Sequence, residues 1–542
     1  MSSQPQHRLK VKLPPMMERT ASSVMTSALE RIPDKIALRD PAREFSYRGL
    51  VEEGLKLAGA LIDLGLNRQQ TVLAMLDNSA DFVLLSTGLS LTARIEAPVN
   101  TAYRGPLLAH VIRTSGAKIM IIEEKYLERL IEIGNDLETI DTLIIRGAGD
   151  TAPDLPPHIK VLDFDRLERR PEPMDDVKPW DIICIIYTSG TTGPSKGALI
   201  SHAQAYSYAS IVQQENLDST DVSMVVLPLF HVTAKWAGIY AAFIYQASAV
   251  ILPGFSATTF FDSARKYKAT SARMLGTIAQ FLLNQPERPD DKDQPIKKVG
   301  ITPVIADLER FKERFGISGV ATGYGSTEAS VIATAPMGKG MSGYAGYVRD
   351  DYEFRIVDEY DMDVPPGEVG EMVVRSNEPW MIMQGYVNMP EATNKVMRNG
   401  WFHTGDLMRV SPNGQLIFCD RNNDALRRKG ENISSFEIER EINAHPAVIE
   451  SAAIKAPSNH TDDDVKACIA LKPGQSVSPE EIITFLKPRL PGFMLPRYVE
   501  FLDALPKTPT EKILKAELRK TPFTRQTYDC ESGRYMAQDD PA

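Results

Sequence analysis

The chain has 542 residues, which is too many for one hydrophobic core, so we expect at least two domains. The formal net charge of -10 argues against a general nucleic-acid binder. The four cysteines, at 184, 419, 468 and 530, form no C-x-x-C motif, which argues against a zinc site or a disulfide framework and favours a reducing cytoplasm. No apolar run is long enough to span a membrane, and residues 1–20 lack the apolar segment of a secretory signal.

Helical patterns alternate with short apolar strands in the first 150 residues. Ser46 begins a helix that Gly65 ends, and a second, apolar helix is predicted at 81–91. Strands are predicted at 71–76, 95–99, 119–122 and 142–145. This alternation favours a parallel, doubly wound α/β sheet. Residues 153–178 are rich in proline and charge and predict a surface connection.

A phosphate-binding loop is predicted directly after this connection. Residues 182–186 are apolar and β-branched, as in a buried strand, and the sequence then reads T-S-G-T-T-G-P-S-K-G from Thr188 to Gly197. Glycine amides, hydroxyls and a lysine together favour phosphate binding. An ordinary P-loop is excluded by the spacing, because Ser195 precedes Lys196 where glycine is required. A solvated Gly/Ser/Thr hairpin is the structural alternative.

A second α/β run follows the loop and leads into a β-rich region. We expect strands at 221–227, 249–252 and 319–325, helices at 232–247 and 257–268, and short β segments at 353–357, 370–375 and 415–419. Residues 1–420 thus form a large domain of two doubly wound α/β subdomains and a small β-rich subdomain.

A compact α+β domain is predicted for residues 421–520, followed by a flexible tail at 521–542. Its strands are predicted at 451–455, 465–471 and 498–502. Ser434 and Glu437 predict a capping box for a helix at 436–444, and Ser478 with Pro479 predicts the start of a helix that reaches residue 490.

Several separated motifs, in order along the chain, resemble the signatures of the adenylate-forming superfamily, which includes acyl-CoA synthetases, adenylation domains and luciferases. They are the loop at 188–197, Y-G-S-T-E at 324–328, W-F-H-T-G-D at 401–406, D-R at 420–421, R-K-G-E-N at 428–432, and P-K-T at 506–508 ahead of Lys512. The resemblance covers roughly residues 46–520 and favours the acyl-CoA ligase branch. R-R-K-G-E-N-I-S-S at 427–435 looks most like crotonobetaine/carnitine-CoA ligase-type sequences.

The resemblance implies a nucleotide site with named roles. Tyr324 would stack on adenine, Asp406 would accept hydrogen bonds from the ribose hydroxyls, and Arg421 would reach ribose or phosphate. The catalytic residues would be Lys512, His231 and Glu328, with Thr188 and Glu328 holding Mg²⁺. The full ATP-binding set is Thr188, Ser189, Gly190, Thr191, Thr192, Gly193, Lys196, Gly323, Tyr324, Gly325, Thr327, Asp406, Arg421 and Lys512. The structural alternatives are a core tyrosine for Tyr324, a solvated charge for Glu328 or Lys512, a turn residue for Asp406 and an interdomain ion pair for Arg421.

Three further regions follow from the same resemblance. The acyl pocket would comprise His231, Trp236, Tyr240, Ile301 and Thr302, although Trp236 and Tyr240 fit a core role equally well. CoA would contact Arg428, Lys429, Gly430 and Glu431, and the hinge would be Asn423. Five positions depart from the superfamily pattern: Ser195 replaces its proline, Glu511 its glycine before the lysine, Ile301 and Thr302 its glycine-rich wall, and Asn423 its acidic residue or lysine.

The implied activity is that of an ATP-dependent carboxylate–CoA ligase. An acyl-adenylate and pyrophosphate would form first, the C-terminal domain would then move about Asn423, and an acyl-CoA thioester and AMP would form second. We expect ATP, Mg²⁺ and CoA as cofactors, a small carboxylate as substrate, no nucleic-acid partner, no membrane span and a cytoplasmic location, with a homodimer left open. The alternatives are an enzyme that passes the acyl group to an amine or a carrier protein, a luciferase-like oxidative enzyme, and a nucleotide-binding pseudo-enzyme.

Overall fold

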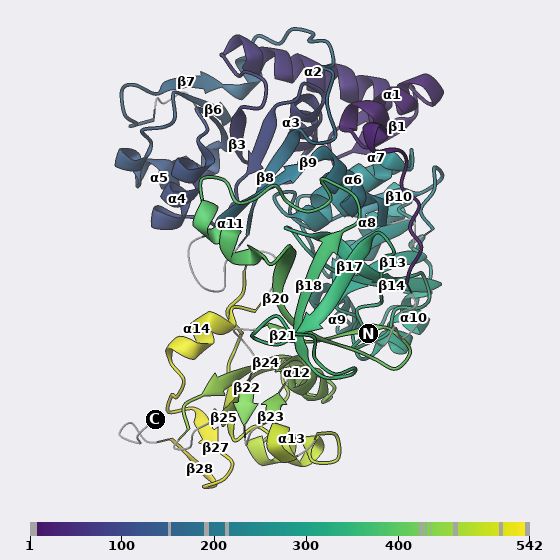
Figure 1. The fold of residues 1–542 in the computed structure, drawn as a ribbon, viewed down its shortest axis with the longest axis vertical. Coiled ribbons are helices and arrows are strands. Elements are labelled where there is room, and N and C mark those ends of the chain that lie inside the picture. The colour runs from purple at the N-terminus through teal and green to yellow at the C-terminus, as the bar shows by residue number, and fades with distance from the viewer. Residues whose placement is uncertain are drawn as a thin grey trace.

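The computed structural model describes residues 8–149, 153–188, 195–211, 216–421, 426–428, 431–433, 435–458, 464–490, 492–508 and 513–536. The predicted fold class is confirmed: two large, mainly parallel sheets and a smaller β-rich sheet are followed by a small α+β domain. This last domain, drawn from green to yellow in Figure 1, lies at the opposite end of the long axis from the first large sheet. Among the described residues, no helix combines the length and apolar character needed to cross a bilayer.

The first large sheet has seven strands, and only β9 runs antiparallel to its neighbour. In spatial order they are β7 (Lys160–Asp163), β6 (Thr142–Arg146), β5 (Ile119–Glu123), β3 (Thr71–Met75), β4 (Ile95–Pro98), β8 (Ile182–Thr188) and β9 (Lys196–Ser201). Parallel strands covered on both faces need apolar residues throughout, and Ile182–Ile186 of β8 are all buried. The edge strand β7 lies within the stretch predicted as a surface connection, so that prediction was wrong for these residues.

The second large sheet has nine strands and carries antiparallel pairs at both edges. In spatial order they are β16 (Tyr347–Val348), β15 (Ser330–Ala335), β14 (Gly319–Ser326), β13 (Lys298–Thr302), β12 (Ser271–Leu275), β10 (Val222–Val225), β11 (Ser248–Ile251), β1 (Ile36–Arg39) and β2 (Glu44–Ser46). The β-rich sheet consists of β17 (Tyr352–Val357), β18 (Gly370–Ser376), β20 (Trp401–Val410), β19 (Met397–Arg398) and β21 (Leu416–Arg421).

Helices pack around and between these sheets (Figure 1). Those of the large domain are α1 (Ala21–Arg31), α2 (Tyr47–Asp63), α3 (Ala80–Leu91), α4 (Gly105–Ser115), α5 (Leu127–Ile131), α6 (His202–Ser210), α7 (Ala241–Ile244), α8 (Phe260–Tyr267), α9 (Gly276–Leu283), α10 (Leu308–Phe315) and α11 (Pro390–Val396). Single 3₁₀ turns occur at Met16–Glu18, Glu124–Tyr126, Gly134–Asp136, Phe164–Arg166 and Gly492–Met494. Helix α2 starts as predicted, because Ser46 Oγ accepts a hydrogen bond from the Gly49 amide.

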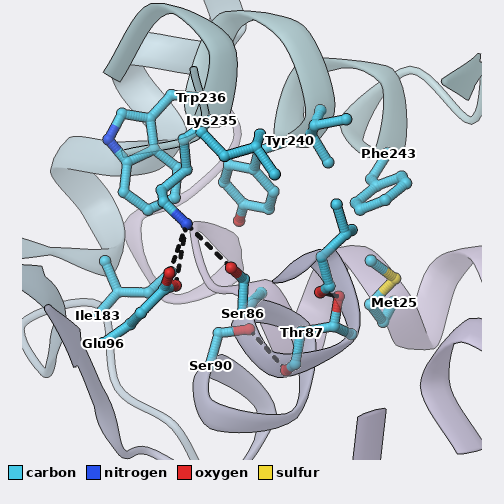
Figure 2. A pocket seen from close by; sticks show the side chains of 14 residues that line it. Met25, Ser86, Thr87, Ser90, Glu96, Ile183, Lys235, Trp236, Tyr240 and Phe243 are labelled. Atoms are coloured by element: carbon cyan, nitrogen blue, oxygen red, sulfur yellow. Dashed lines mark hydrogen bonds and ion pairs between the residues drawn. The ribbon is translucent and has the colours of Figure 1, made fainter. Parts of the chain in front are cut away.

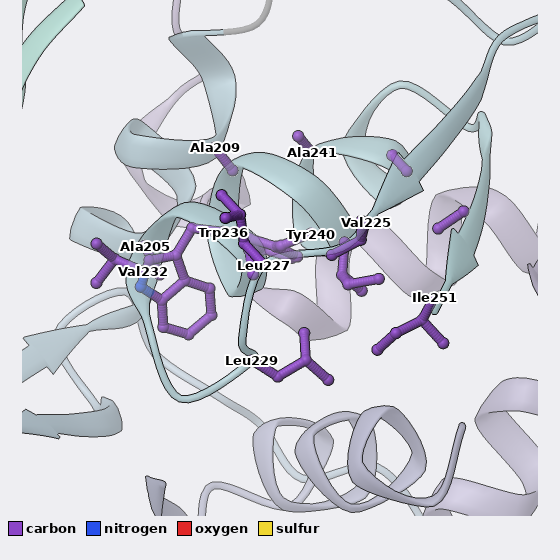
Figure 3. Close-up of a cluster of buried hydrophobic side chains, with 14 of the residues drawn as sticks. Ala205, Ala209, Val225, Leu227, Leu229, Val232, Trp236, Tyr240, Ala241 and Ile251 are labelled. Carbon is purple, nitrogen blue, oxygen red and sulfur yellow. The ribbon is translucent and has the colours of Figure 1, made fainter. Parts of the chain in front are cut away.

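One hydrophobic core spans both large sheets and includes α3, whose residues are buried on almost every side. Helices α2 and α3 cross at Gly54 and Gly88, where a Cβ on Gly88 would lie 2.0 Å from the Gly54 carbonyl oxygen. Part of the core lies between β10 and the following helical segment, where Val225, Leu229, Trp236 and Tyr240 gather (Figure 3). The predicted helix at 232–247 is present, but Thr233–Tyr240 forms a π-helix (η6) ahead of α7.

The C-terminal domain packs three helices on a five-stranded sheet and a separate hairpin. Its elements are β22 (Leu426–Arg428), β23 (Glu431–Ile433), α12 (Ser435–Asn443), β24 (Val448–Ala456), β25 (Asp464–Leu471), α13 (Pro479–Leu486), β26 (Tyr498–Phe501), α14 (Lys515–Lys520), β27 (Thr527–Asp529) and β28 (Arg534–Tyr535). Ser478 and Glu481 form a reciprocal capping box, although α13 ends at Leu486, earlier than predicted. The predicted cap at Ser434 lies outside the described residues.

Two strands follow residue 520, where a flexible tail was predicted. Strand β27 pairs with β26, and β28 pairs with β27. The hydroxyls of Thr524 and Thr527 donate to Glu500 at 2.7 and 2.8 Å, and Glu500 is also ion-paired with the buried Lys466. A buried carboxylate that needs hydrogen-bond donors therefore fixes this segment to the sheet.

His202, the first residue of α6, makes the stability of the fold depend on pH. It is fully buried, it accepts a hydrogen bond from the Ala21 amide at 3.3 Å, and its burial lowers its pKa from 6.5 to about 3. The unfolded chain therefore binds a proton below about pH 6.5 that the folded protein does not bind until about pH 3. This contribution to stability is complete above pH 6.5 and is lost as the pH falls toward 3.

We predict that His202→Asn, which keeps an acceptor for the Ala21 amide, makes unfolding less sensitive to acid. Between neutral pH and about pH 4.5 the wild type should lose on the order of 2 kcal/mol more unfolding free energy than the variant. Urea unfolding across this pH range measures the difference, with the exposed His158→Asn as control. Parallel pH profiles for wild type and His202→Asn would contradict the prediction.

Candidate active site

Two predicted motifs follow the carboxyl ends of parallel strands, where ligands of open α/β sheets bind. Strand β8 ends at Thr188, where the phosphate loop begins, and β14 leads through Tyr324 into Thr327 and Glu328. Thr188 and Lys196 are opposite each other in the β8–β9 ladder, and Thr188 Oγ1 donates to the Lys196 carbonyl at 3.4 Å. The two ends of the loop are therefore held together by backbone pairing.

Ser195, which replaces the superfamily proline, closes the base of this loop with its side chain. It is 4% exposed, and its hydroxyl donates to the Thr188 carbonyl at 2.8 Å. Tyr103 Oη lies 3.2 Å from the same hydroxyl, and His110 Nε2 lies 2.8 Å from the Ser195 carbonyl oxygen. Proline has no hydroxyl, so this chain uses side-chain hydrogen bonds where the superfamily uses a rigid ring.

Lys196 and Glu328, far apart in the sequence, meet through Tyr386. The Tyr386 hydroxyl donates to Glu328 Oε1 at 2.8 Å, and Lys196 Nζ lies 5.5 Å from the centre of the Tyr386 ring. Burial and the adjacent Glu328 raise the pKa of Tyr386, so the phenol remains a neutral donor. Gln204 Nε2 donates to the carbonyls of Thr327 and Glu328 at 3.0 Å and fixes the backbone here.

Tyr324 and Asp406 form a second cluster. The Tyr324 hydroxyl donates to Asp406 Oδ2 at 2.7 Å, and Asp406 is 7% exposed. Asp406 of β20 is opposite Arg421 of β21 in the antiparallel ladder, so the two predicted ribose-binding positions are neighbours. The structure thus brings together the residues predicted to bind adenosine, although the Arg421 side chain lies outside the described part of the chain.

Close pairing of β14 with β15 explains why residues 323 and 325 are glycines, and the sequence alone did not show this reason. A Cβ on Gly325 would lie 2.2 Å from the Ser330 carbonyl oxygen, and one on Gly323 would lie 3.0 Å from that of Ala333. Both glycines therefore let β14 pair closely with β15, and they position Tyr324 between them.

Several predicted site residues lie outside the described part of the chain. They are Ser189, Gly190, Thr191, Thr192, Gly193, Asn423, Lys429, Gly430 and Lys512. Arg428 and Glu431 are opposite each other in the backbone ladder of the β22–β23 hairpin.

The five residues predicted for the acyl pocket separate into two groups. Trp236 and Tyr240 line a cavity of about 50 Å³, whereas His231, Ile301 and Thr302 are not among its walls. Ile301 is fully buried and Thr302 is exposed. Figure 2 shows the cavity, whose walls are Ala21, Met25, Val83, Ser86, Thr87, Ser90, Glu96, Ile183, Leu229, Lys235, Trp236, Ile239, Tyr240 and Phe243.

A buried ion pair lies in this cavity and joins the two large sheets. Lys235 Nζ lies 2.8 and 2.9 Å from the two carboxylate oxygens of Glu96 and donates to Ser86 Oγ at 2.9 Å. The side chains of Lys235 and Glu96 are 5% and 4% exposed. Sequence analysis missed both residues, although a lone charge inside an apolar helix and another inside an apolar strand are the signal for such a pair.

Comparison with known proteins gives the family. The profile of the AMP-binding enzyme family matches residues 25–387, and that of the AMP-binding enzyme C-terminal domain matches residues 437–512. The chain belongs to the AMP-binding enzyme family. It is 30% identical to the crotonobetaine/carnitine–CoA ligases of Salmonella typhimurium and Salmonella typhi over 492 residues, which cover 88% of this chain and 93% of theirs.

Solved structures agree with this membership. The anthranilate CoA ligase AuaEII in complex with anthranoyl-AMP aligns with a TM-score of 0.84 at 25% identity, over 94% of this chain and 98% of that one. ATP-bound MatB from Rhodopseudomonas palustris aligns with a TM-score of 0.81 at 25% identity, over 93% and 99% of the two chains. The predicted membership of the acyl-CoA ligase branch of the adenylate-forming enzymes is thereby confirmed.

The donor set at Glu328 fits a magnesium ion that arrives with ATP. Glu328 Oε1 accepts a hydrogen bond from Tyr386, which occupies one of its two carboxylate oxygens. Among the described residues, no group of three or more His, Cys, Asp or Glu side chains could hold a metal. Mg²⁺ is commonly bound by one or two carboxylates together with substrate phosphates, so a single glutamate is sufficient.

We predict that Tyr386→Phe weakens the function of Glu328 without removing its charge. Loss of this charge-assisted hydrogen bond should lower kcat/KM for ATP about tenfold and raise the Mg²⁺ concentration required for half-maximal rate. ATP–pyrophosphate exchange at varied Mg²⁺ measures both effects, and the exposed Tyr360→Phe is the control. An unchanged Mg²⁺ requirement in Tyr386→Phe would show that this bond does not position Glu328.

The buried Lys235–Glu96 ion pair leads to a prediction about the stability of the fold. Lys235→Met leaves the Glu96 carboxylate buried without its cation and should lower the unfolding free energy by about 3–5 kcal/mol. The double variant Lys235→Met/Glu96→Leu should recover most of this loss, because a well-packed apolar pair can replace a buried ion pair. Urea unfolding tests this against Lys118→Met, which removes the exposed ion pair with Asp141 and should cost about 1 kcal/mol or less. A double variant no more stable than Lys235→Met would refute the explanation.

Proposed function

We propose that this protein joins a small carboxylic acid to CoA in two half-reactions that share one active site. In the first, a carboxylate oxygen attacks the α-phosphorus of ATP, pyrophosphate leaves, and an acyl-adenylate forms. In the second, the CoA thiolate attacks the acyl carbon, AMP leaves, and the thioester forms. The observation that carries the proposal is that residues 324–328 contact both predicted clusters: Tyr324 donates to Asp406, and Glu328 accepts from Tyr386, whose ring lies against Lys196 at the end of the phosphate loop.

The described residues bind and orient ATP in this scheme. Tyr324 offers its ring to adenine, and its hydroxyl aligns Asp406 to accept hydrogen bonds from the ribose hydroxyls. Lys196 and the loop that it closes neutralise the phosphates. Glu328 and the Thr188 hydroxyl are proposed to hold Mg²⁺, which offsets charge that develops on the phosphate oxygens.

Lys512 and the C-terminal domain supply the remaining parts of the proposal. Lys512 stabilises the negative charge that develops during adenylation, and movement about Asn423 then removes it from the site. Arg428, Lys429, Gly430 and Glu431 are proposed to meet CoA after that movement, with a cation on its phosphates. His231 is proposed as a polar wall between the acyl group and the thiol.

The cellular setting is part of the same proposal. We place the enzyme in the cytoplasm, where its thiols stay reduced, because Cys184 and Cys468 are buried and widely separated. Besides ATP and CoA, the chemistry requires a small carboxylate, and the names of the Salmonella relatives support testing betaine-type acids among the candidates. A homodimer remains to be measured by light scattering.

We predict that Lys512→Ala lowers carboxylate-dependent ATP–pyrophosphate exchange by about 10² to 10³, because it removes a preorganised charge. Binding of ATP should change only slightly. The assay uses a panel of short, medium-chain, aromatic and betaine-type acids, followed by mass detection of the thioester after CoA is added. The exposed Lys520→Ala serves as control.

The outcomes separate the alternatives. Exchange without any thioester would favour transfer to an amine or a carrier protein. Oxygen uptake would favour a luciferase-like oxidation. ATP binding without exchange for any acid would favour a pseudo-enzyme, and full exchange in Lys512→Ala would refute the role of this lysine.

A further inference from the structure

No step described so far uses the cavity of Figure 2. Ile183 in its wall belongs to β8, the strand that ends at the phosphate loop. Leu229 in its wall belongs to the P-L-F-H segment that carries His231. Ile183 lies five residues before the end of β8 at Thr188, whereas Leu229 lies two residues before His231, so the cavity lies next to the segment proposed to border the acyl group.

Most polar groups in the cavity wall already have partners. The Lys235 ammonium group donates hydrogen bonds to the Glu96 carboxylate and to the Ser86 hydroxyl. The hydroxyls of Thr87 and Ser90 donate to the carbonyls of Val83 and Thr87, each at 2.8 Å. These groups need no ligand, and the remaining polar groups of the wall are the Trp236 indole N–H and the Tyr240 hydroxyl.

Trp236 Nε1 and the Tyr240 hydroxyl are both buried without a partner among the described residues, and the Tyr240 hydroxyl is the group that Figure 2 shows directed into the cavity. Tyr240 is 6% exposed, and its hydroxyl oxygen is directed toward the side of the cavity where Lys235 and Ser86 lie. Burial raises the pKa of Tyr240 well above its usual range, so the phenol is a neutral donor. An unpaired buried hydroxyl is destabilising, and an acceptor in the cavity would remove that cost.

We infer that this cavity receives the distal end of the acyl group and selects acids that carry a neutral oxygen acceptor, such as a hydroxyl or carbonyl, at that end. The inference rests on the proposed function and names its substrate class. A volume of about 50 Å³ admits roughly four water-sized groups. A plain hydrocarbon end would leave the Tyr240 hydroxyl unpaired, and a quaternary ammonium end would lie close to the Lys235 cation.

Matched pairs of acids test this inference. Each ω-hydroxy acid is compared with the alkanoic acid in which a methyl group replaces the hydroxyl, over a series of increasing chain length, by ATP–pyrophosphate exchange. For the chain length that reaches the cavity, the wild type should prefer the hydroxy acid about five- to tenfold in kcat/KM. Tyr240→Phe should abolish or invert this preference and retain exchange with the alkanoic partner.

Stability and a control variant separate this role from a structural one. Because the Tyr240 hydroxyl has no partner, Tyr240→Phe should keep or raise the melting temperature in the absence of substrate. Tyr245→Phe is the matched control: its hydroxyl donates to the Ser210 carbonyl at 2.9 Å, so it should lower the melting temperature and leave the preference among acids unchanged. Lys235→Met/Glu96→Leu makes the polar end apolar and should shift the preference toward alkanoic acids.

The possible failures are distinct. Exchange with both members of every pair but no preference in the wild type would overturn this inference and leave the proposed function intact. A preference that survives in Tyr240→Phe would also overturn it. Exchange with no acid at all would defeat the proposed function, and this inference with it.

Discussion

A buried ammonium–carboxylate pair joins the two large sheets, and the arrangement of the acyl side depends on it. Glu96 comes from β4 of the first sheet, Lys235 from the π-helix of the second run, and Ser86 from the helix α3 that both sheets bury. Separating the two charges without water is costly, so sheets and helix must keep one relative position. That position brings Leu229 and Ile183 to the same cavity and fixes where Tyr240 points.

The nucleotide side depends on contacts between the two large sheets. The loop after β8 and the segment after β14 belong to different sheets, and Tyr386 links them, because its hydroxyl donates to Glu328 and its ring lies 5.5 Å from Lys196 Nζ. Antiparallel pairing then places Lys196 opposite Thr188 and Arg421 opposite Asp406. The hydroxyls of Tyr386 and Tyr324 orient the two acidic residues, so both carboxylates are positioned before ATP binds.

The C-terminal domain has its own hydrophobic core, as a part that moves during catalysis would need. Its last strands are fixed by the Lys466–Glu500 pair and two threonine hydroxyls, so the sheet extends beyond the matched family domain. A domain with an independent core can change position without repacking the large domain.

The sequence by itself determined the fold class, the order of the motifs and most elements, because hydrophobic period, capping residues and glycine-rich loops are local signals. Tyr324 with Asp406 and Thr188 with Lys196 were predicted as one site and found as neighbours. Only the tertiary structure decided which distant side chains contact these site residues. Tyr386 lies in no recognisable motif and acts only because folding brings its hydroxyl to Glu328. Lys235 and Glu96, which form the buried ion pair, are separated by more than a hundred residues. Thr527 was assigned to a tail because a short polar strand has no recognisable sequence pattern, and only its hydrogen bond to the buried Glu500 carboxylate shows that it belongs to the sheet. These contacts are long-range, and no local signal in one sequence encodes which distant group will meet a given side chain.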